Sequence, residues 1–379
     1  MKIIFHMTSR YPTSKAYGVT TGETARALRE LGNEVKIVAP QHPNCKYDLY
    51  ENEILGVSSP VLIFLRKYSS NIRGVAKFTF VITSMLLTFK SIKFIHREKP
   101  DVIWARDYWA VLLLQGFLPK CRFVVEVHQF PSFSANLALL SLIRQNQTAL
   151  LAIQKSLKEE LEKRYPRAKV FFGPMGASCS FFERGRLKIL SYPSRQVGEL
   201  KVCYLGRKTS SGEDNGLTQL LEDWKGIPSG VAHLTLIGLT QPEINQMGTT
   251  QSQGNVTFLP SVSHEDVPRV LSEFDCGIIP YPEGDYHRTR FPIKIVEYCA
   301  SALNIIANET ESNKELLTNA FSFFYAAGDS KGLLKMLLLI KENIQDSQRR
   351  AEQGFEWAQD YTYQKRLRDI HPFLEGRIN

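Results

Sequence analysis

Short apolar runs alternate with amphipathic stretches along the first half of the chain. The runs predict buried strands, because a strand covered on both faces is apolar throughout. Strands are predicted at Ile3–Met7, Glu34–Ala39, Asp101–Ala105, Phe123–Val127, Leu150–Ile153 and Val170–Phe172. Helices are predicted between them, at Thr21–Leu31, Gly74–Glu98 and Lys155–Arg164. Such alternation predicts a parallel sheet with helices on both faces.

The alternation starts again after a polar stretch, Glu183–Leu200, which we interpret as a linker between two domains. Strands are predicted at Lys201–Leu205, His233–Ile237, Val256–Leu259, Gly277–Ile279 and Asn304–Ala307, and helices at Leu217–Lys225, Glu265–Ser272 and Lys294–Cys299. A chain of 379 residues is also long for one hydrophobic core. We therefore expect two doubly wound, Rossmann-like α/β domains, residues 1–190 and 191–356, followed by a helical stretch, residues 357–379, that crosses back to the first domain.

Charge is unevenly distributed over the chain. The net charge is +9, but residues 1–190 carry +14 and residues 191–379 carry −5. The first half is therefore expected to meet an anionic partner, such as a membrane surface or a phosphorylated acceptor; a soluble domain that is merely basic is the alternative. The six cysteines are scattered and form no C-x-x-C pair, which predicts reduced thiols in a cytoplasmic protein. The apolar start of the chain is too short for a signal peptide and predicts a strand.

A dense group of chemically capable residues follows the predicted strand Gly277–Ile279. It comprises Arg288, Arg290, Pro292, Lys294 and Glu297. Proline suits the first turn of a helix, and Lys294 and Glu297 share one helical face. Ligands of doubly wound sheets bind at the carboxyl ends of the strands, and helix starts offer free N–H groups to phosphate. We predict a diphosphate near Lys294 and a ribose near Glu297; a solvated ion pair between the two is the alternative.

A second group of cations follows the predicted strand Lys201–Leu205. Gly206 allows the backbone to approach a ligand, and Arg207 and Lys208 suit a leaving diphosphate, whose charge they would stabilise. Its position supports this interpretation, because the group follows a strand of the same predicted sheet, just as the group around Lys294 does.

Two further loops lie at strand ends in the first half. Gly18 and Gly22 flank the predicted start of the first helix, where backbone N–H groups can face a phosphate, although neither dinucleotide nor P-loop glycine motifs are present. His128 leaves the predicted strand Phe123–Val127, where it either contacts substrate or is a structural histidine.

These segments together resemble the retaining glycosyltransferases of GT-B architecture, in the family-four group. The most specific segment is Arg288-x-Arg290-x-Pro292-x-Lys294-x-x-Glu297-Tyr298, and Ala300–Ala307 follows it. The supporting matches are the Gly18/Gly22 loop, Pro100–Ile103 with Arg106 and Asp107, Glu126-x-His128, and Tyr204–Arg207. The resemblance covers nearly the whole chain and implies two domains that face one another across a cleft.

The resemblance also implies an activity. The co-substrate would be a UDP- or GDP-linked sugar, with no cofactor and no metal ion, and the acceptor a hydroxyl of a glycan or lipid-linked molecule. Transfer would retain the anomeric configuration and serve cell-surface polysaccharide or glycolipid synthesis. Lys294 and Arg207 would hold the diphosphate and Glu297 the ribose, while His128 would lie near the transferred sugar and Gly18 near the phosphates. No nucleic-acid partner is expected.

The sequence departs from the family pattern in three places. The usual glutamate eight residues before Glu297 falls at Thr289, and Glu283 or Asp285 is the candidate replacement. Asn215 stands where lysine is common, and Asn304 where proline is common. A catalytically inactive sugar-nucleotide-binding or scaffold protein therefore stays an alternative, as does a sugar-nucleotide epimerase of the same architecture.

The predicted helix Gly74–Glu98 combines apolar residues with lysines and an arginine. Its uncharged part is shorter than the ~20 residues that span a bilayer. The helix either packs on the sheet or lies at a membrane interface, with its cations on anionic head groups. We therefore expect a cytoplasmic protein, either free or peripheral on the inner face of the membrane.

Overall fold

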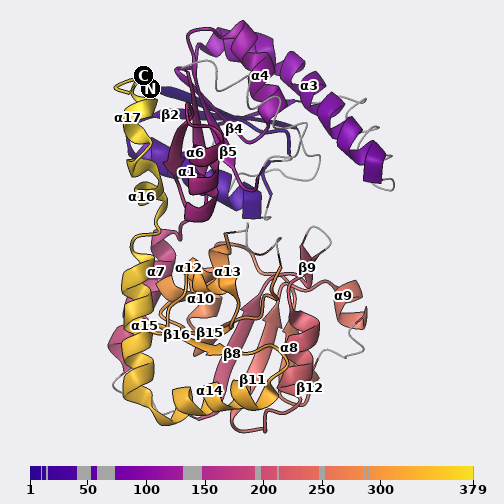
Figure 1. Cartoon of the computed structure of the whole chain (residues 1–379), viewed down its shortest axis with the longest axis vertical. Coiled ribbons are helices and arrows are strands. Elements are labelled where there is room, and N and C mark those ends of the chain that lie inside the picture. Colours follow the sequence, from indigo (N-terminus) through magenta and orange to yellow (C-terminus); the bar gives the residue numbers. More distant parts are fainter. Residues whose placement is uncertain are drawn as a thin grey trace. The chain divides into compact units, whose positions relative to one another are not determined.

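The computed structural model describes residues 1–9, 11–13, 16–40, 53–57, 73–130, 147–192, 198–210, 213–246, 252–284, 287 and 291–378. The chain divides into two compact units. Unit 1 comprises Met1–Pro174 and Tyr363–Asn379, and unit 2 comprises Met175–Thr362. Each unit is built on its own seven-stranded sheet (Figure 1).

The sheet of unit 1 is entirely parallel, with the order β3-β2-β1-β4-β5-β6-β7. Its strands are β1 (Lys2–His6), β2 (Glu34–Pro40), β3 (Glu53–Val57), β4 (Val102–Ala105), β5 (Arg122–Val127), β6 (Thr148–Ala152) and β7 (Lys169–Phe172). Every residue of β4 and β6 is buried, which explains why these strands are continuous apolar runs. The strand order reverses between β1 and β4.

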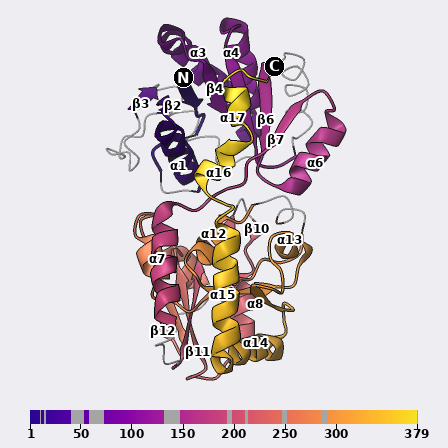
Figure 2. The ribbon, with the colours of Figure 1, turned by 90° about the vertical axis from the view of Figure 1, so that its left-hand side faces the viewer.

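Helices α1 (Ala16–Glu30), α16 (Tyr363–Arg368) and α17 (His371–Leu374) lie together in unit 1 (Figure 2). Their apolar side chains share one core with the sheet, in which Leu28, Leu367 and Phe373 are buried. Helices α3 (Arg73–Glu98) and α4 (Tyr108–Phe117) pack against each other, and α4 also packs on β4 and β5. Helix α6 (Lys155–Arg164) packs on β6 and β7.

The sheet of unit 2 has the order β12-β13-β11-β8-β14-β15-β16, and all its pairs are parallel except β12 with β13. Its strands are β8 (Leu200–Leu205), β11 (Ala232–Ile237), β12 (Ser252–Gln253), β13 (Val256–Leu259), β14 (Cys276–Ile279), β15 (Asn304–Asn308) and β16 (Ser322–Tyr325). A separate hairpin joins β9 (Thr209–Ser210) to β10 (Glu213–Asp214). Here the order reverses between β8 and β14.

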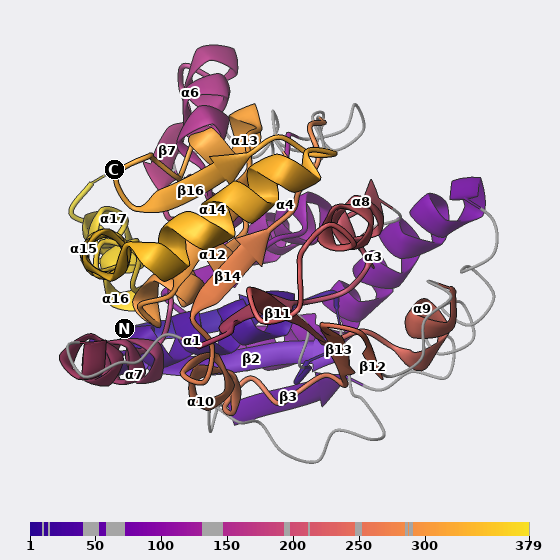
Figure 3. The same ribbon diagram turned by 90° about the horizontal axis from the view of Figure 1, so that it is seen from below.

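Unit 2 has helices in two groups around its sheet. Helices α8 (Leu217–Trp224) and α14 (Ser330–Glu342) pack together, and Trp224, Leu333 and Leu337 enter the core (Figure 3). Helices α7 (Cys179–Ser191), α12 (Ile293–Ala300) and α15 (Ile344–Ala358) form the other group. The short helices are α9 (Gln241–Gln246), α10 (Val267–Leu271) and α13 (Glu311–Lys314). Two doubly wound α/β units are thus confirmed.

The expected linker at Glu183–Leu200 is wrong, because α7 occupies the chain as far as Ser191. Gly185 lies against α12, where an added Cβ would stand 2.1 Å from the carbonyl oxygen of Ala300. This close packing makes α7 part of unit 2. The divisions therefore fall after residues 174 and 362, and not after 190 and 356 as expected. That the units face one another across a cleft stays a prediction.

Cysteine pairing and membrane spans were also open questions. The five cysteines in the described part of the chain are free thiols, and all but Cys179 are buried; Cys45 lies outside it. Among the described residues, no helix has both the length and the hydrophobicity needed to cross a bilayer.

Candidate active site

Strands β8 and β14 separate at their carboxyl ends. They pair only through Val202 with Cys276 and Cys203 with Gly277, and further along the Leu205 N–H donates to the Tyr298 hydroxyl at 2.8 Å. Gly277 makes room for that ring, since a Cβ there would lie 2.3 Å from a Tyr298 ring carbon. Because the strand order reverses between these two strands, this is the place where a doubly wound sheet binds ligands.

Lys294 lies directly over Gly206 at this point. Its ammonium nitrogen is 2.6 Å from where a Cβ of Gly206 would stand, and it donates to the Tyr204 hydroxyl at 3.1 Å. It also lies 4.2 Å from the ring centroid of Tyr204 and 5.2 Å from that of Tyr281. The side chain is 9% exposed. Two aromatic faces thus stabilise a buried positive charge beside a bare stretch of backbone.

Glu243 holds the loop that carries Arg207 and Lys208, and sequence reasoning missed it. Its carboxylate accepts from Arg207 Nε at 2.8 and 3.1 Å and from the Lys208 N–H at 3.2 Å. Burial acts to raise the pKa of Glu243, but hydrogen bonds from Thr240 and Arg207 lower it overall. The signal was present as Thr240-x-x-Glu243, a capping box at the start of α9.

Asn215 replaces a lysine that is common in the family pattern, and it also supports this loop. Its side-chain amide donates to the Arg207 carbonyl at 2.8 Å, and its own N–H donates to the Lys208 carbonyl at 2.9 Å. The Arg207 side chain stays 57% exposed, so the loop is fixed while its cation remains accessible.

The other predicted site residues of unit 2 differ in burial and in the contacts that they make. Pro292 is the N-cap of α12, one position before the expected first turn, and Glu297 is buried on that helix. Glu283 is exposed, and its carboxylate accepts from the Glu311 N–H at 2.9 Å, which caps α13. The two arginines at positions 288 and 290, together with Asp285 and Thr289, lie outside the described residues.

His287 is a second residue that sequence reasoning missed. Its ring stacks on Tyr281 with 5.1 Å between centroids, and its Nε2 lies 3.0 Å from the Asp214 carbonyl. His287 therefore positions the aromatic ring that faces the Lys294 ammonium.

In unit 1, Glu126 is the centre of a buried ionic cluster. Its Oε1 accepts from Arg106 at 2.9 Å and from His128 Nε2 at 2.7 Å, and it forms an ion pair with the Arg366 guanidinium at 2.8 Å. Its Oε2 accepts from Trp104 Nε1 at 3.1 Å. Burial acts to raise the pKa of Glu126, but the charges of Arg106 and then Arg366 hold it well below its usual range. The carboxylate is therefore ionised and fully satisfied.

Arg366 comes from α16, far along the chain from the rest of the cluster, and it is 1% exposed. With Lys365 and Arg368 beside it, the sequence of this segment is typical of a basic helix on the protein surface. No local signal in the sequence marks Arg366 as the buried member.

His128 is held neutral by these surroundings. Burial, followed by the charge of Arg106, lowers its pKa to about 4, although Glu126 acts to raise it. Nε2 carries the proton that goes to Glu126, so Nδ1 is left as a hydrogen-bond acceptor. The side chain is 33% exposed, so a neutral acceptor sits at the carboxyl end of β5.

A cavity of about 60 Å³ lies beside this cluster, at the carboxyl ends of β1 and β4, where the strand order of unit 1 reverses. Its lining includes His6, Thr21, Arg106 and Glu126. The expectation that Gly18 and Gly22 flank the start of the first helix is wrong, because α1 begins at Ala16 and both glycines lie inside it; that Gly18 lies near the phosphates stays a prediction. Gly18 lets the preceding loop pack closely, since a Cβ there would lie 2.5 Å from the Thr13 carbonyl oxygen.

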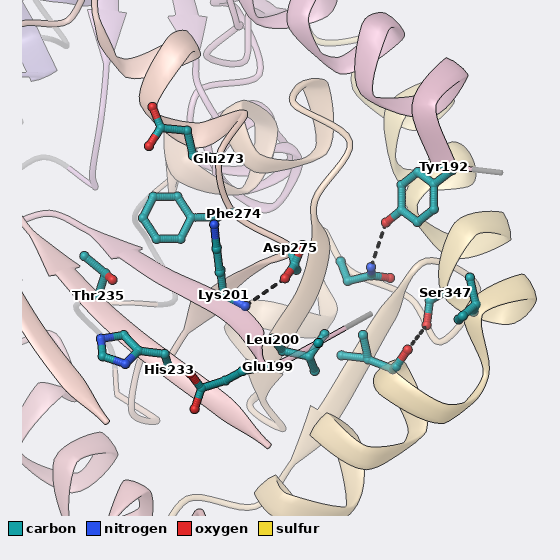
Figure 4. A pocket seen from close by; sticks show the side chains of 14 residues that line it. Tyr192, Glu199, Leu200, Lys201, His233, Thr235, Glu273, Phe274, Asp275 and Ser347 are labelled. Atoms are coloured by element: carbon teal, nitrogen blue, oxygen red, sulfur yellow. Dashed lines mark hydrogen bonds between the residues drawn. The ribbon is translucent and has the colours of Figure 1, made fainter. Parts of the chain in front are cut away.

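A larger cavity, of about 730 Å³, lies in unit 2 at the amino ends of the strands. Lys201, His233 and Asp275 line it, and the Lys201 N–H donates to Asp275 at 2.7 Å (Figure 4). It contains none of the predicted site residues. Because catalytic groups of such sheets gather at the opposite, carboxyl edge, we do not place the active site in this cavity.

Two family models match the chain. The model described as Glycosyltransferase Family 4 matches residues 18–179, and the model described as Glycosyl transferases group 1 matches residues 199–343. Comparison with curated protein sequences found no match.

Solved structures with the same fold are similar over the whole chain. The Anabaena protein HepE, crystallised with UDP, is 16% identical over 99% of this chain and 100% of its own, with a TM-score of 0.68. A glycosyltransferase from Rickettsia africae is 15% identical over 100% and 99%, with a TM-score of 0.69. Sucrose-phosphate synthase from Thermosynechococcus elongatus is 12% identical over 100% and 97%, with a TM-score of 0.67. The fold is therefore the two-domain GT-B fold.

Proposed function

The chain belongs to the group 1 glycosyltransferases, and from this premise we propose that it moves a sugar from a nucleoside diphosphate sugar to an acceptor hydroxyl with retention of configuration. The observation that carries the proposal is the Lys294 ammonium over Gly206, where β8 and β14 separate. The HepE structures, which hold UDP and UDP-glucose, support a uridine-linked donor.

In this proposal the donor diphosphate lies over Gly206, between Lys294 and the Arg207–Lys208 loop. The charge of Lys294 and the first N–H groups of α12 stabilise the leaving phosphate, which needs no metal ion for this purpose. Glu297, on the same helix, accepts from the ribose hydroxyls. Arg288 and Arg290, which come shortly before α12 in the sequence, add positive charge.

In this proposal His128 forms a hydrogen bond with the sugar that is transferred. A neutral imidazole with a free acceptor at Nδ1 suits a sugar hydroxyl, whereas an imidazolium would have no acceptor to offer. The leaving phosphate helps to deprotonate the attacking hydroxyl on the same face of the sugar, which retains the configuration. The acceptor is a glycan or lipid-linked molecule of the cell surface, and the protein works at the cytoplasmic face of the membrane.

Product analysis tests this reaction against its rivals. The purified protein is incubated with UDP- and GDP-sugars, with and without acceptor glycolipids, and free nucleotide and products are measured. A transferase releases nucleoside diphosphate as sugar appears on the acceptor with unchanged anomeric configuration. Conversion of the donor sugar alone indicates an epimerase, and binding without turnover indicates an inactive sugar-nucleotide-binding protein.

Gly206→Ala should reduce transfer at least tenfold. Gly206 has φ +141°, which strains any residue with a Cβ, and the new methyl group would displace the Lys294 ammonium. Gly230→Ala is the matched control, since Gly230 has φ +83° but open space where its Cβ would stand. Steady-state kinetics and UDP titration of both variants check this, and equal losses would assign the effect to backbone strain alone.

The pH profile should carry no inflection at the ordinary histidine pKa of ~6.5. His128 must be neutral to accept a hydrogen bond, and its pKa of about 4 keeps it neutral until the pH falls well below 6. We therefore expect kcat/KM to be insensitive to His128 protonation between pH 8 and pH 5. An inflection near pH 6.5 that disappears in His128→Asn would contradict the assignment.

A further inference from the structure

Helix α3 carries large apolar side chains on both its buried and its open side. The buried side combines Leu87 and Ile95 with small polar residues, of which Ser84 is 2% exposed and Thr88 and Ser91 are fully buried. Its open side carries Leu86, which is 36% exposed, and Phe89, which is 53% exposed. A helix that serves only as a cover for a sheet keeps its large apolar residues on the inner side. The exposed apolar residues of α3 therefore need a separate explanation.

The inner polar residues are fully used by hydrogen bonds. The Ser84 hydroxyl donates to the Asp107 carboxylate, and the Thr88 and Ser91 hydroxyls donate to carbonyls one turn back on α3, each at 2.8 Å. Since the proton of Ser91 is already donated, His6 Nε2 must be the donor in its 3.3 Å contact with Ser91 Oγ. His6 also lines the small cavity of unit 1, so this hydrogen bond joins the polar side of α3 to the wall of that cavity.

The open side of α3 is also strongly basic. Lys90, Lys93 and Arg97 are exposed among the apolar residues, and residues 82–97 include no acidic side chain. Glu98, the first acidic residue after them, is paired with Lys2 and Lys36. Apolar side chains and cations therefore share one surface, which we call the α3 face: Leu86, Phe89, Lys90, Lys93 and Arg97.

We propose that the α3 face docks on an anionic lipid bilayer. Leu86 and Phe89 enter the boundary between head groups and acyl chains, and the cations lie among anionic head groups. A second copy of the chain would bring like charges together, and nucleic acid, whose bases can stack on Phe89, offers no apolar surface for Leu86. Docking places the cavity behind α3 close to the lipid surface, which deepens the proposed function by making the acceptor a membrane lipid.

Vesicle binding of the full chain, without donor or acceptor, tests this proposal independently of any catalysis. Vesicles of phosphatidylcholine with 30 mol% phosphatidylglycerol are compared with pure phosphatidylcholine by co-sedimentation. We expect clear binding to the anionic vesicles only. The double variant Lys90→Gln/Lys93→Gln should weaken it about 30-fold, at roughly 1 kcal/mol for each cation. Leu86→Ser/Phe89→Ser should weaken it at least tenfold.

The matched control is an exposed pair on α7 of unit 2. Leu187 is 61% and Leu190 72% exposed, so the pair is at least as apolar as Leu86 and Phe89, but the exposed Glu183 lies beside the exposed Arg184 and Arg186 and makes this surface less basic. Leu187→Ser/Leu190→Ser should bind anionic vesicles as the unaltered protein does. Equal binding to neutral vesicles, equal loss in the α7 variant, or no loss in either α3 variant would each overturn the proposal. So would a dimer in solution that the α3 variants dissociate.

Discussion

Lys294→Ala should lower sugar transfer by a factor of 10² to 10³ or more, while the fold is preserved. The ammonium is the buried cation at the separation of β8 and β14, and removal of one preorganised charge from a developing oxyanion costs about 3–4 kcal/mol of transition-state stabilisation. Steady-state kinetics measure the loss in kcat, and circular dichroism checks the fold.

Lys188→Met is the matched control for that experiment. Lys188 is also a lysine of unit 2 with 8% exposure, but its ammonium donates to the Phe274 carbonyl, before β14 begins. Its loss should affect stability and leave kcat nearly unchanged. If Lys294→Ala turned over within threefold of the unaltered protein, or if both variants lost kcat equally, the donor site would have to be placed elsewhere.

Arg366→Met should destabilise unit 1 by about 1–3 kcal/mol, because the buried Glu126 carboxylate loses one charged partner while Arg106 still neutralises it. Denaturant unfolding measures the loss, followed by tryptophan fluorescence, to which Trp104 and Trp109 contribute from unit 1. The double variant Glu126→Gln/Arg366→Met should be no more stable than Arg366→Met, because it leaves the Arg106 guanidinium without its carboxylate. Transfer should fall in the double variant, since His128 loses the carboxylate that orients it.

Arg368→Met, two residues along, controls for the loss of an arginine from the same segment. Arg368 is 74% exposed and pairs with its neighbour Asp369, so we expect a change within about 0.5 kcal/mol. A similar loss of stability in Arg366→Met and Arg368→Met would show that the buried cluster does not stabilise the unit.

The two sheets could be predicted from the sequence because their strands are buried on both faces. Runs such as Ile3–Met7 and Gly277–Ile279 can be recognised without knowledge of the strands that they pair with. Helix α7 was not predicted, because its sequence is polar on one side and carries Gly185. A glycine usually indicates the end of a helix, and only the packing of α12 against Gly185 explains why it lies inside this one. Helix α4 was not predicted, because its ten mostly apolar residues show no clear helical periodicity.

The site was predictable where it follows a strand and not where it is assembled from distant segments. Lys294 and Gly206 were both singled out, and the structure brings them into contact. Arg366 could not be found, because the charge that it meets, Glu126, is 240 residues away in the sequence and lies at the end of another element. Glu243 had a recognisable capping signal, but its second role as a support for Arg207 depends on tertiary structure.

The core of unit 1 includes Leu367, Ile370 and Phe373, from the last residues of the chain. A ribosome makes these residues last, so the first 174 residues emerge without the segment that completes their core. Unit 2, whose residues 175–362 are continuous, has all its parts earlier. Unit 1 can therefore complete its core only after the whole of unit 2 has been synthesised, although its sheet is translated first.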